Sequence, residues 1–163
     1  MFIKKKPFII AEAGVNHNGN LDIAKKLIIG AKKAGSDAIK FQSFITEDLT
    51  KKNAPKVPYQ INKKKISETH FQMLKKLELS FTDQKKLFYF CKKLNIKFIS
   101  TPFDIKSALF LKKIGVNIIK ISSGDLTDLL LHETISKFNK EVIISTGMSN
   151  MFEIKRSLNL YKN

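Results

Sequence analysis

Short apolar runs alternate along the chain with longer amphipathic stretches, and this alternation limits the possible folds most strongly. The runs lack a polar face, which is typical of strands buried on both sides within a parallel sheet. The longer stretches carry apolar residues at helical spacing and begin at capping residues such as Asn20, Ser80 and Asp104. Repeated strand–helix units leave two architectures, a doubly wound open sheet or a (β/α)8 barrel. The expected strands are 8–11, 38–42, 97–101, 117–121 and 142–145.

The expected helices follow the strands, except after the second one. There, residues 43–79 interrupt the rhythm with a Pro-containing stretch, a lysine run and a short helical piece at 67–77. A connection of this length is usually functional. We therefore expect a lid-like excursion over the strand ends. The remaining helices are expected at 20–33, 80–94, 104–114, 126–138 and 151–160.

Length and composition fit one globular domain covering residues 1–163. The one cysteine, Cys91, lies among apolar residues of an expected helix, which favours a small core side chain over a nucleophile. No window approaches the roughly 18 apolar residues of a membrane span. The opening residues also lack the long uncharged run of a signal peptide. We therefore expect a cytoplasmic protein without a membrane partner.

The net charge of +16 raises the question of nucleic-acid binding. Specific phosphate and base recognition tends to use Arg, and this chain has a single one, Arg156. The lysines instead come in doublets within expected amphipathic helices, which is typical of a solvated face. We therefore expect no specific nucleic-acid partner, although the field can attract an anionic substrate. The doublets are Lys25-Lys26, Lys32-Lys33, Lys75-Lys76, Lys85-Lys86, Lys92-Lys93 and Lys112-Lys113.

Polar side chains collect at the C-terminal end of every expected strand. In a barrel these ends converge on one face, where active sites form, whereas in an open sheet they spread along an edge. Five successive polar strand ends therefore favour the barrel. The residues are Glu12, Lys40 with Gln42, Ser100-Thr101, Lys120 with Ser122-Ser123, and Ser145-Thr146.

The kinds of residue at these ends suit an anion with several oxygens. Two lysines supply fixed positive charge, and Ser and Thr hydroxyls donate directional hydrogen bonds. Glu12 is better placed to accept hydrogen bonds from a neutral, hydroxyl-rich second substrate. The alternative is a structural network in which Lys40 and Lys120 pair with Glu12 and Asp125, although burying two lysines without function is costly.

Other polar residues give weaker signals. His17 can contact a substrate or simply belong to a turn, and His70 and His132 are expected on helix surfaces. Three scattered histidines do not predict a metal site. The stretch 14–19 has neither Walker A spacing nor a dinucleotide fingerprint, which argues against a nucleotide site.

The ordered motifs resemble those of the N-acetylneuraminate synthase family over nearly the whole chain. Two further stretches, 54–60 and 72–79, resemble the N,N'-diacetyllegionaminate synthase branch more than the sialic acid branch. The motifs are Ile10-Ala11-Glu12-Ala13-Gly14-Val15-Asn16-His17-Asn18-Gly19, Lys40-Phe41-Gln42, Ser100-Thr101-Pro102-Phe103, Lys120-Ile121-Ser122-Ser123-Gly124-Asp125 and Ser145-Thr146-Gly147-Met148.

The resemblance implies condensation of phosphoenolpyruvate with an open-chain N-acylated mannosamine-type sugar. The products would be a nine-carbon α-keto acid, a nonulosonate, and phosphate. Glu12, Lys40 and Lys120 would be catalytic, with Glu12 toward the sugar. Asp125 stands where the family usually has Glu. The implied substrate-binding residues are Gln42, Thr101, Ser123, Asp125 and Ser145.

The resemblance covers only the N-terminal part of the family, the first five units of a (β/α)8 barrel. Strands six to eight, with two histidines that bind Mn or Mg, and a C-terminal antifreeze-like domain are expected to be absent. Loss of the metal, a Lewis acid for the aldehyde, predicts little synthase activity from this chain alone. It would then be a truncated synthase, one half of a split synthase completed by a second chain or a homodimer, or a non-catalytic anion-binding or assembly module.

Overall fold

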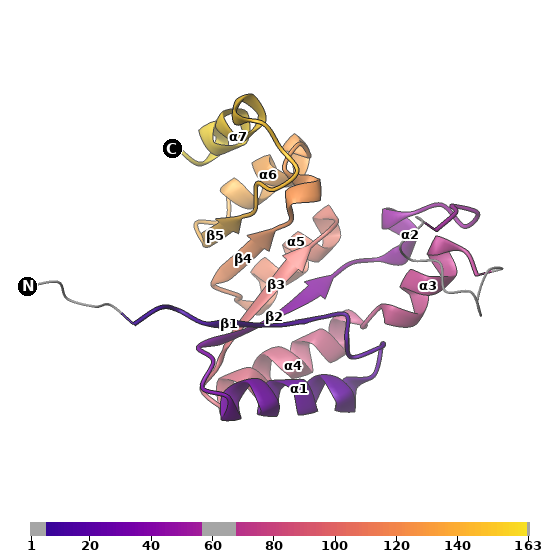
Figure 1. Cartoon of the computed structure of the whole chain (residues 1–163), viewed down its shortest axis with the longest axis vertical. Coiled ribbons are helices and arrows are strands. Elements are labelled where there is room, and N and C mark those ends of the chain that lie inside the picture. Colours follow the sequence, from indigo (N-terminus) through magenta and orange to yellow (C-terminus); the bar gives the residue numbers. More distant parts are fainter. Residues whose placement is uncertain (1–5, 57–67, 163) are drawn as a thin grey trace, which may run out of the picture.

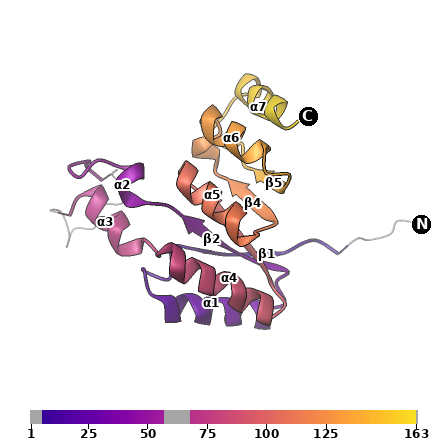
Figure 2. The same ribbon diagram turned by 180° about the vertical axis from the view of Figure 1, so that it is seen from behind.

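A computed structural model describes residues 6–56 and 68–162 of the chain. Five parallel strands form one sheet in the order of the sequence. Helices cover one face of this curved sheet, along its lower and far sides in Figure 1 and along its lower and near sides in Figure 2. Sequential parallel neighbours with helices on one side are the geometry of a (β/α)8 barrel, here over five units. The strands are β1 (Ile10–Gly14), β2 (Ala38–Ser43), β3 (Lys97–Pro102), β4 (Ile118–Ile121) and β5 (Glu141–Ile144).

The helices begin where the sequence offers a capping side chain. Asn20 accepts hydrogen bonds from two backbone N–H groups of the first turn, and Ser80, Asp104 and Asn150 cap later helices. Gly115 ends one helix in the left-handed conformation, at φ 87°. The main helices are α1 (Leu21–Lys33), α4 (Phe81–Lys93), α5 (Ile105–Ile114), α6 (Leu129–Ser136) and α7 (Met151–Leu158), with 3-10 turns η2 (Ser123–Asp125) and η3 (Asn159–Tyr161).

The last two predicted helices have different boundaries in the structure. The helix expected at 126–138 begins only at Leu129, because the chain first makes the turn η2 and Asp128 then caps α6 by accepting from the Leu131 N–H. The helix expected at 151–160 ends at Leu158 and continues as the tighter turn η3.

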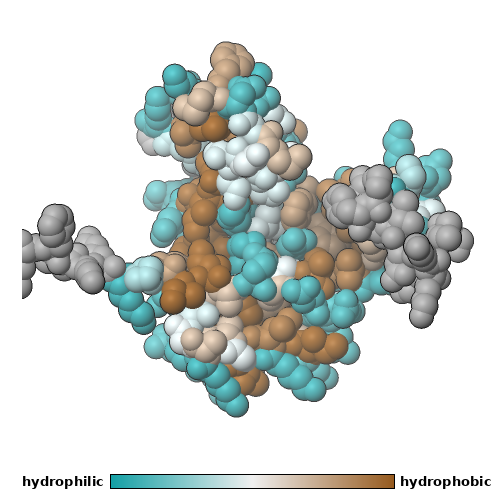
Figure 3. Space-filling view, in the orientation of Figure 1, coloured by the Kyte–Doolittle hydropathy of each residue, from teal (hydrophilic) through white to brown (hydrophobic). Residues whose placement is uncertain are grey.

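Alternate residues of the strands build two different layers. Side chains on the helix-facing side form the main core, for example Phe41 and Phe98, whose rings stack 5.5 Å apart. The other side carries a smaller apolar cluster in which Ala38, Ile99 and Ile118 are buried. One step further toward the strand ends, this inner side becomes polar. Figure 3 shows apolar side chains gathered along the side of the sheet that no helix of the described residues covers.

The excursion expected at 43–79 stands at the C-terminal end of β2, where it forms α2 (Thr46–Leu49) and α3 (His70–Leu77) (Figure 1). Thr69 and Gln72 make a capping box, so α3 begins later than the predicted 67. Residues 57–67, with part of the 54–60 motif and the lysine run, lie outside the described residues. The segment is tied to the next loop, because the Ile45 N–H donates to Asp104 Oδ2 at 2.9 Å.

The surface agrees with the sequence in most respects. The lysine doublets are exposed, except that Lys25 is half-buried, and Cys91 is fully buried in the core, as predicted. Burial raises the pKa of the Cys91 thiol to about 12, which suits an unreactive core residue. Within the described residues, no helix combines the length and apolar character needed to cross a membrane.

His132 was wrongly expected on a helix surface. Its side chain is fully buried on the inner side of α6, where Nδ1 lies 3.0 Å from the Tyr161 hydroxyl and the two rings meet edge to face. The turn η3, which the sequence did not predict, brings Tyr161 over this position.

Candidate functional site

A pocket of about 290 Å³ lies where the C-terminal ends of the strands meet on the inner side of the sheet. Seven of the eight site residues expected from the sequence line it, and they come from all five strands or the turns directly after them. The lining residues are Glu12, Lys40, Gln42, Thr101, Phe103, Lys120, Ser122, Ser123 and Ser145.

Strand pairing brings these side chains together. Glu12 lies opposite Lys40 in the β1–β2 pair, and Gln42 lies opposite Thr101 in the β2–β3 pair. Because neighbouring parallel strands are about 4.8 Å apart, side chains in register on one face lie within reach of a single small ligand. The pocket is therefore a consequence of the register.

A bulge in β1 orients Glu12. The pairing with β2 shifts between Glu12 and Gly14, and Gly14 adopts φ +51°. A Cβ atom at Gly14 would lie 3.2 Å from Glu12 Oε1, tighter than most real contacts, besides the strain of this φ. Glycine thus leaves room for the Glu12 carboxylate, which forms an ion pair with Lys40.

The two lysines sit in different environments. Lys40 is mostly buried and faces Glu12, whose side chain is about half exposed. Lys120 donates a hydrogen bond to the Ile121 carbonyl and has no carboxylate among the ion pairs of the described residues. Burial, and then the neighbouring Lys40 charge, lower the pKa of Lys120, against the opposing effect of Glu12 and Asp125. An anion entering the pocket would relieve this unfavourable positive charge.

The alternative prediction was a purely structural network in which both lysines pair with carboxylates, and it holds only for Lys40. The Lys40–Glu12 pair exists, whereas Lys120 bonds to a backbone carbonyl and not to Asp125. Two ammonium groups facing one pocket with a single paired carboxylate leave net positive charge there. This arrangement suits a multiply charged anion.

Asp125 is the expected site residue that does not line the pocket. Its Oδ2 is buried without a hydrogen-bond partner among the described residues. Burial and Asp128 raise the pKa of Asp125, while the nearby Ser122 hydroxyl and the Lys120 charge oppose that shift. Its role toward a sugar stays a prediction.

Phe103 and Ser122 also line the pocket. Ser122 was among the polar residues expected at the strand ends, although not among the implied substrate-binding residues, whereas Phe103 was in neither set. Both directly follow a strand, Phe103 after β3 and Ser122 after β4. The position of Phe103 one residue beyond the strand end was the signal that could have included it, because loops after barrel strands build the site.

His17 belongs to the loop before α1 and does not line the pocket. It is 1% exposed, packs on Phe41, and its Nδ1 accepts a hydrogen bond from the Gly19 N–H at 3.0 Å. Burial lowers the pKa of His17, which favours the neutral ring that this acceptor role requires. The turn interpretation therefore describes His17 better than substrate contact.

The described residues do not fit a divalent metal ion. They include no group of three or more His, Cys, Asp or Glu side chains that could hold one. In the pocket itself, the Glu12 carboxylate is already paired with Lys40, and two ammonium groups would repel a cation. No chemical step through a metal follows from these residues.

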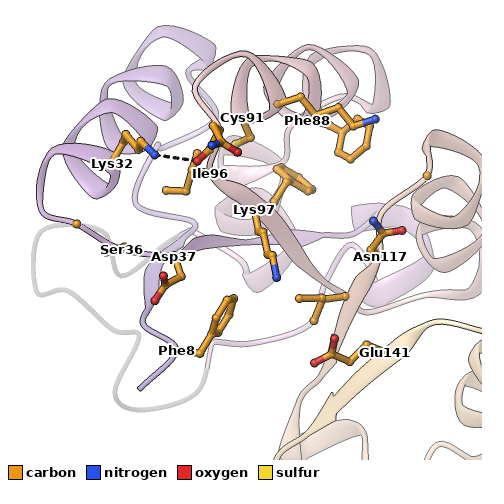
Figure 4. Close-up of a pocket in the computed structure, with 16 residues that line it drawn as sticks. Phe8, Lys32, Ser36, Asp37, Phe88, Cys91, Ile96, Lys97, Asn117 and Glu141 are labelled. Atoms are coloured by element: carbon orange, nitrogen blue, oxygen red, sulfur yellow. Dashed lines mark hydrogen bonds between the residues drawn. The ribbon is translucent and has the colours of Figure 1, made fainter. Parts of the chain in front are cut away.

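A second and larger cavity, about 720 Å³, lies at the opposite, N-terminal ends of the strands. Figure 4 shows two of its lysines: Lys32 Nζ donates to the Asn95 carbonyl at 2.8 Å, and Lys97 Nζ lies 4.9 Å from the centre of the Phe8 ring. None of the expected site residues lines it.

Comparison with known proteins places the chain in a family. A sequence model of the NeuB family matches residues 27–163. The chain belongs to the NeuB family. It is 48% identical over 156 residues to an N,N'-diacetyllegionaminic acid synthase of Campylobacter jejuni, covering 96% of this chain and 47% of that protein. It is 32% identical to the human N-acetylneuraminate-9-phosphate synthase, over 95% of this chain and 43% of that protein.

Among solved structures, the N-acetylneuraminic acid (sialic acid) synthetase from Leptospira borgpetersenii, in complex with citrate, superimposes with a TM-score of 0.82 at 34% identity. The match covers 97% of this chain and 50% of that one. The predicted resemblance and the predicted partial barrel are thus confirmed. The chain spans about half or less of the length of these relatives.

Proposed function

We propose that this NeuB-family chain forms the phosphoenolpyruvate-binding part of a nonulosonate synthase, of the legionaminic or sialic acid type. One observation carries the proposal: Lys40 and Lys120 share a small pocket with the hydroxyls of Thr101, Ser123 and Ser145. Support comes from the names of the relatives, which are legionaminic and sialic acid synthases.

The pocket suits the two anionic groups of phosphoenolpyruvate. The ammonium groups of Lys40 and Lys120 provide charge, and the hydroxyls of Thr101, Ser123 and Ser145 donate hydrogen bonds to phosphate or carboxylate oxygens. Such donors lie on the strands or in the residues directly after them, so they are in place before the ligand arrives and stabilise charge with little reorganisation. Gln42 can bind either group through its amide.

In the proposed reaction, carbon three of phosphoenolpyruvate forms a bond to the aldehyde carbon of an N-acylated mannosamine-type sugar. The π bond of the aldehyde breaks, and its oxygen takes up a proton to become a hydroxyl. Water then adds to the cationic carbon two and loses a proton, and the tetrahedral intermediate collapses to the keto group as the bond to phosphate breaks. Glu12 would accept a hydrogen bond or a proton from the sugar side, since its carboxylate is the exposed one in the pocket. Lys40 and Lys120 would balance the charge that develops on the phosphate and carboxylate oxygens.

We expect the chain by itself to bind phosphoenolpyruvate with little turnover. The described residues offer no metal donor set, although the family resemblance implies Mn or Mg. Among the described residues, β1 and β5 each pair on one side only. That favours completion of the barrel by further strands, from a longer polypeptide, a second chain or a second copy. The cytoplasm, where phosphoenolpyruvate is available, is the proposed location.

Calorimetric titration of the chain tests the proposal. Phosphoenolpyruvate should bind more tightly than inorganic phosphate or pyruvate, since only phosphoenolpyruvate carries both anionic groups. Equal affinity for phosphate and phosphoenolpyruvate would contradict a two-group pocket. A parallel assay for sugar-acid product with Mn²⁺ separates binding from catalysis: robust turnover by this chain alone would refute the expected inactivity.

A further inference from the structure

A buried chain of hydrogen bonds lies directly behind the pocket, on the helix-facing side of β2 and β3. The Oγ atoms of Ser43 and Ser100 are 2.7 Å apart, the Ser43 hydroxyl donates to Gln84 Oε1, and Gln84 Nε2 donates to the Leu79 carbonyl at 2.9 Å. Since Ser43 gives its proton to Gln84, Ser100 must be the donor to Ser43. The chain of bonds therefore has one direction, from β3 through β2 to α4.

These polar groups occupy places where the neighbouring side chains are apolar. Ser43, Ser100 and Gln84 are at most 1% exposed, and Phe41 and Phe98 share their side of the strands. Replacing both partners of a buried hydrogen bond by apolar groups of similar shape is often nearly neutral for stability. Stability alone therefore does not account for the polar residues.

The network is adjacent in sequence to two residues that line the pocket. Ser43 follows Gln42, and Ser100 precedes Thr101, so their side chains point to opposite faces of the same strands. The Phe103 N–H also donates to the Ser43 carbonyl at 3.0 Å. A shift of β2 relative to β3 would break the network behind and displace Gln42 and Thr101 in front.

The same network joins the two ends of the excursion at 43–79. The segment leaves β2 at Ser43 and returns at Leu79, and the Gln84 amide binds both residues. Close by, Glu78 Oε2 accepts from the Thr46 N–H at 2.9 Å. Closing a long loop is unfavourable in entropy, so such bonds decide where its ends lie.

We propose that Gln84, acting through Ser43 and Ser100, is a positioning residue that sets the ends of β2 and β3 and thereby places Gln42 and Thr101 for anion binding. This inference rests on the proposed function, because it assumes that the pocket binds phosphoenolpyruvate.

The test compares phosphoenolpyruvate affinity and melting temperature in two variants. Gln84→Met leaves the Ser43 hydroxyl without its acceptor, and both quantities should fall. In Ser43→Ala/Ser100→Ala/Gln84→Met the side chains of the network are apolar. Its melting temperature should return toward that of the wild type, while affinity stays about tenfold or more below it, because a small misplacement of binding groups is enough.

Cys91→Ala is the matched control, since Cys91 is fully buried on the same helix. It should lower the melting temperature and leave phosphoenolpyruvate affinity unchanged. Wild-type affinity in the triple variant would overturn the proposal. An equal loss of affinity in Cys91→Ala would also overturn it, because the effect would then be general destabilisation.

If the wild-type chain binds no phosphoenolpyruvate, the proposed function fails, and amide hydrogen exchange decides the positioning role. The triple variant should then exchange faster at Gln42, Thr101 and Phe103, with protection kept in β4 and α5. Unchanged exchange at those three amides would overturn the proposal.

Discussion

The two ends of the strands carry cavities that differ in size and in the state of their charges. The cavity at the N-terminal ends is the larger, about 720 Å³ against about 290 Å³ at the C-terminal ends. In the larger one, Lys32 binds a backbone carbonyl and Lys97 lies over Phe8. In the smaller one, Lys40 pairs with Glu12 and Lys120 binds a backbone carbonyl, but both ammonium groups and several hydroxyls line the same space. Convergent charge, and not volume, marks the candidate site.

The difference follows from the direction of the strands and helices. The N-terminal ends of the strands form the lower rim of the sheet, and their C-terminal ends form the upper rim. Helices α1, α4 and α5 end at the lower rim, and each has two lysines in its last turn. Those charges complement the negative ends of the helix dipoles, so they serve the fold. At the upper rim, Lys40 and Lys120 come from strands, where no helix end explains them.

The largest expected effect comes from removing both pocket lysines. Lys40→Ala with Lys120→Ala should weaken phosphoenolpyruvate binding at least about 100-fold, or about 3 kcal/mol, because two charge-assisted contacts are lost. The matched control is Lys92→Ala with Lys97→Ala, which removes the same charge from the larger cavity. Calorimetry of this control should show little change in phosphoenolpyruvate affinity. Equal losses in both pairs would mean that net charge alone attracts the ligand.

Replacing a glycine by alanine should cost more stability at the upper rim than at the lower rim. Gly19 lies in the loop between β1 and α1 with φ +70°, and a Cβ there would lie 2.4 Å from the Lys76 carbonyl oxygen. A Cβ at Gly115, with φ +87°, would meet nothing within 4 Å. Gly19→Ala should therefore lower the free energy of unfolding by about 3 kcal/mol, and Gly115→Ala by about 1 kcal/mol. Urea denaturation measures both, and equal values would contradict the close approach of Gly19 to the Lys76 carbonyl in α3.

The pH dependence of binding should reflect the lowered pKa of Lys120. The ammonium group binds an anion below this pKa, so affinity should fall as pH rises through it, beginning below the ordinary lysine value of about 10.4. The unfolded chain holds this proton more tightly, so stability should rise with pH between the two pKa values. Titration calorimetry between about pH 8 and about pH 10 tests the first sign. Lys120→Met should lose that part of the dependence; a wild-type profile in this variant would assign the titration to another group.

The smallest effect is expected at the lower cavity. Phe8→Leu removes the ring beneath Lys97, and the loss of stability should be about 0.5–1 kcal/mol because the pair is exposed. Phosphoenolpyruvate affinity should not change. A clear loss of affinity, measured by calorimetry, would show that the two ends of the strands are coupled.

Much of the fold could be predicted because its signals are local. Strands β2 to β5 lie within one residue of the predicted apolar runs, and caps such as Asn20, Ser80 and Asp104 begin their helices where expected. The first strand was predicted two residues too early, because the apolar pair Phe8-Ile9 precedes β1 without pairing as a strand. The convergence of residues such as Lys40 and Lys120 followed from one topological rule, that parallel strand ends share a face.

What the sequence missed depends on contacts between distant segments. His132 looked like a surface residue because its partner Tyr161 lies 29 positions away in a turn that was not predicted. The network around Gln84 was missed for the same reason. A pattern of polar and apolar residues shows that serines lie in strands and a glutamine in a helix, but it does not show which of them bond to one another.

Nuclear magnetic resonance of the lysine side-chain ammonium groups tests the central claim most directly. On addition of phosphoenolpyruvate, the Nζ signals of Lys40 and Lys120 should shift together with one saturating affinity, while those of Lys92 and Lys97 stay in place. Shifts spread evenly over the lysines, or confined to the lower pair, would contradict a phosphoenolpyruvate pocket at the C-terminal ends of the strands.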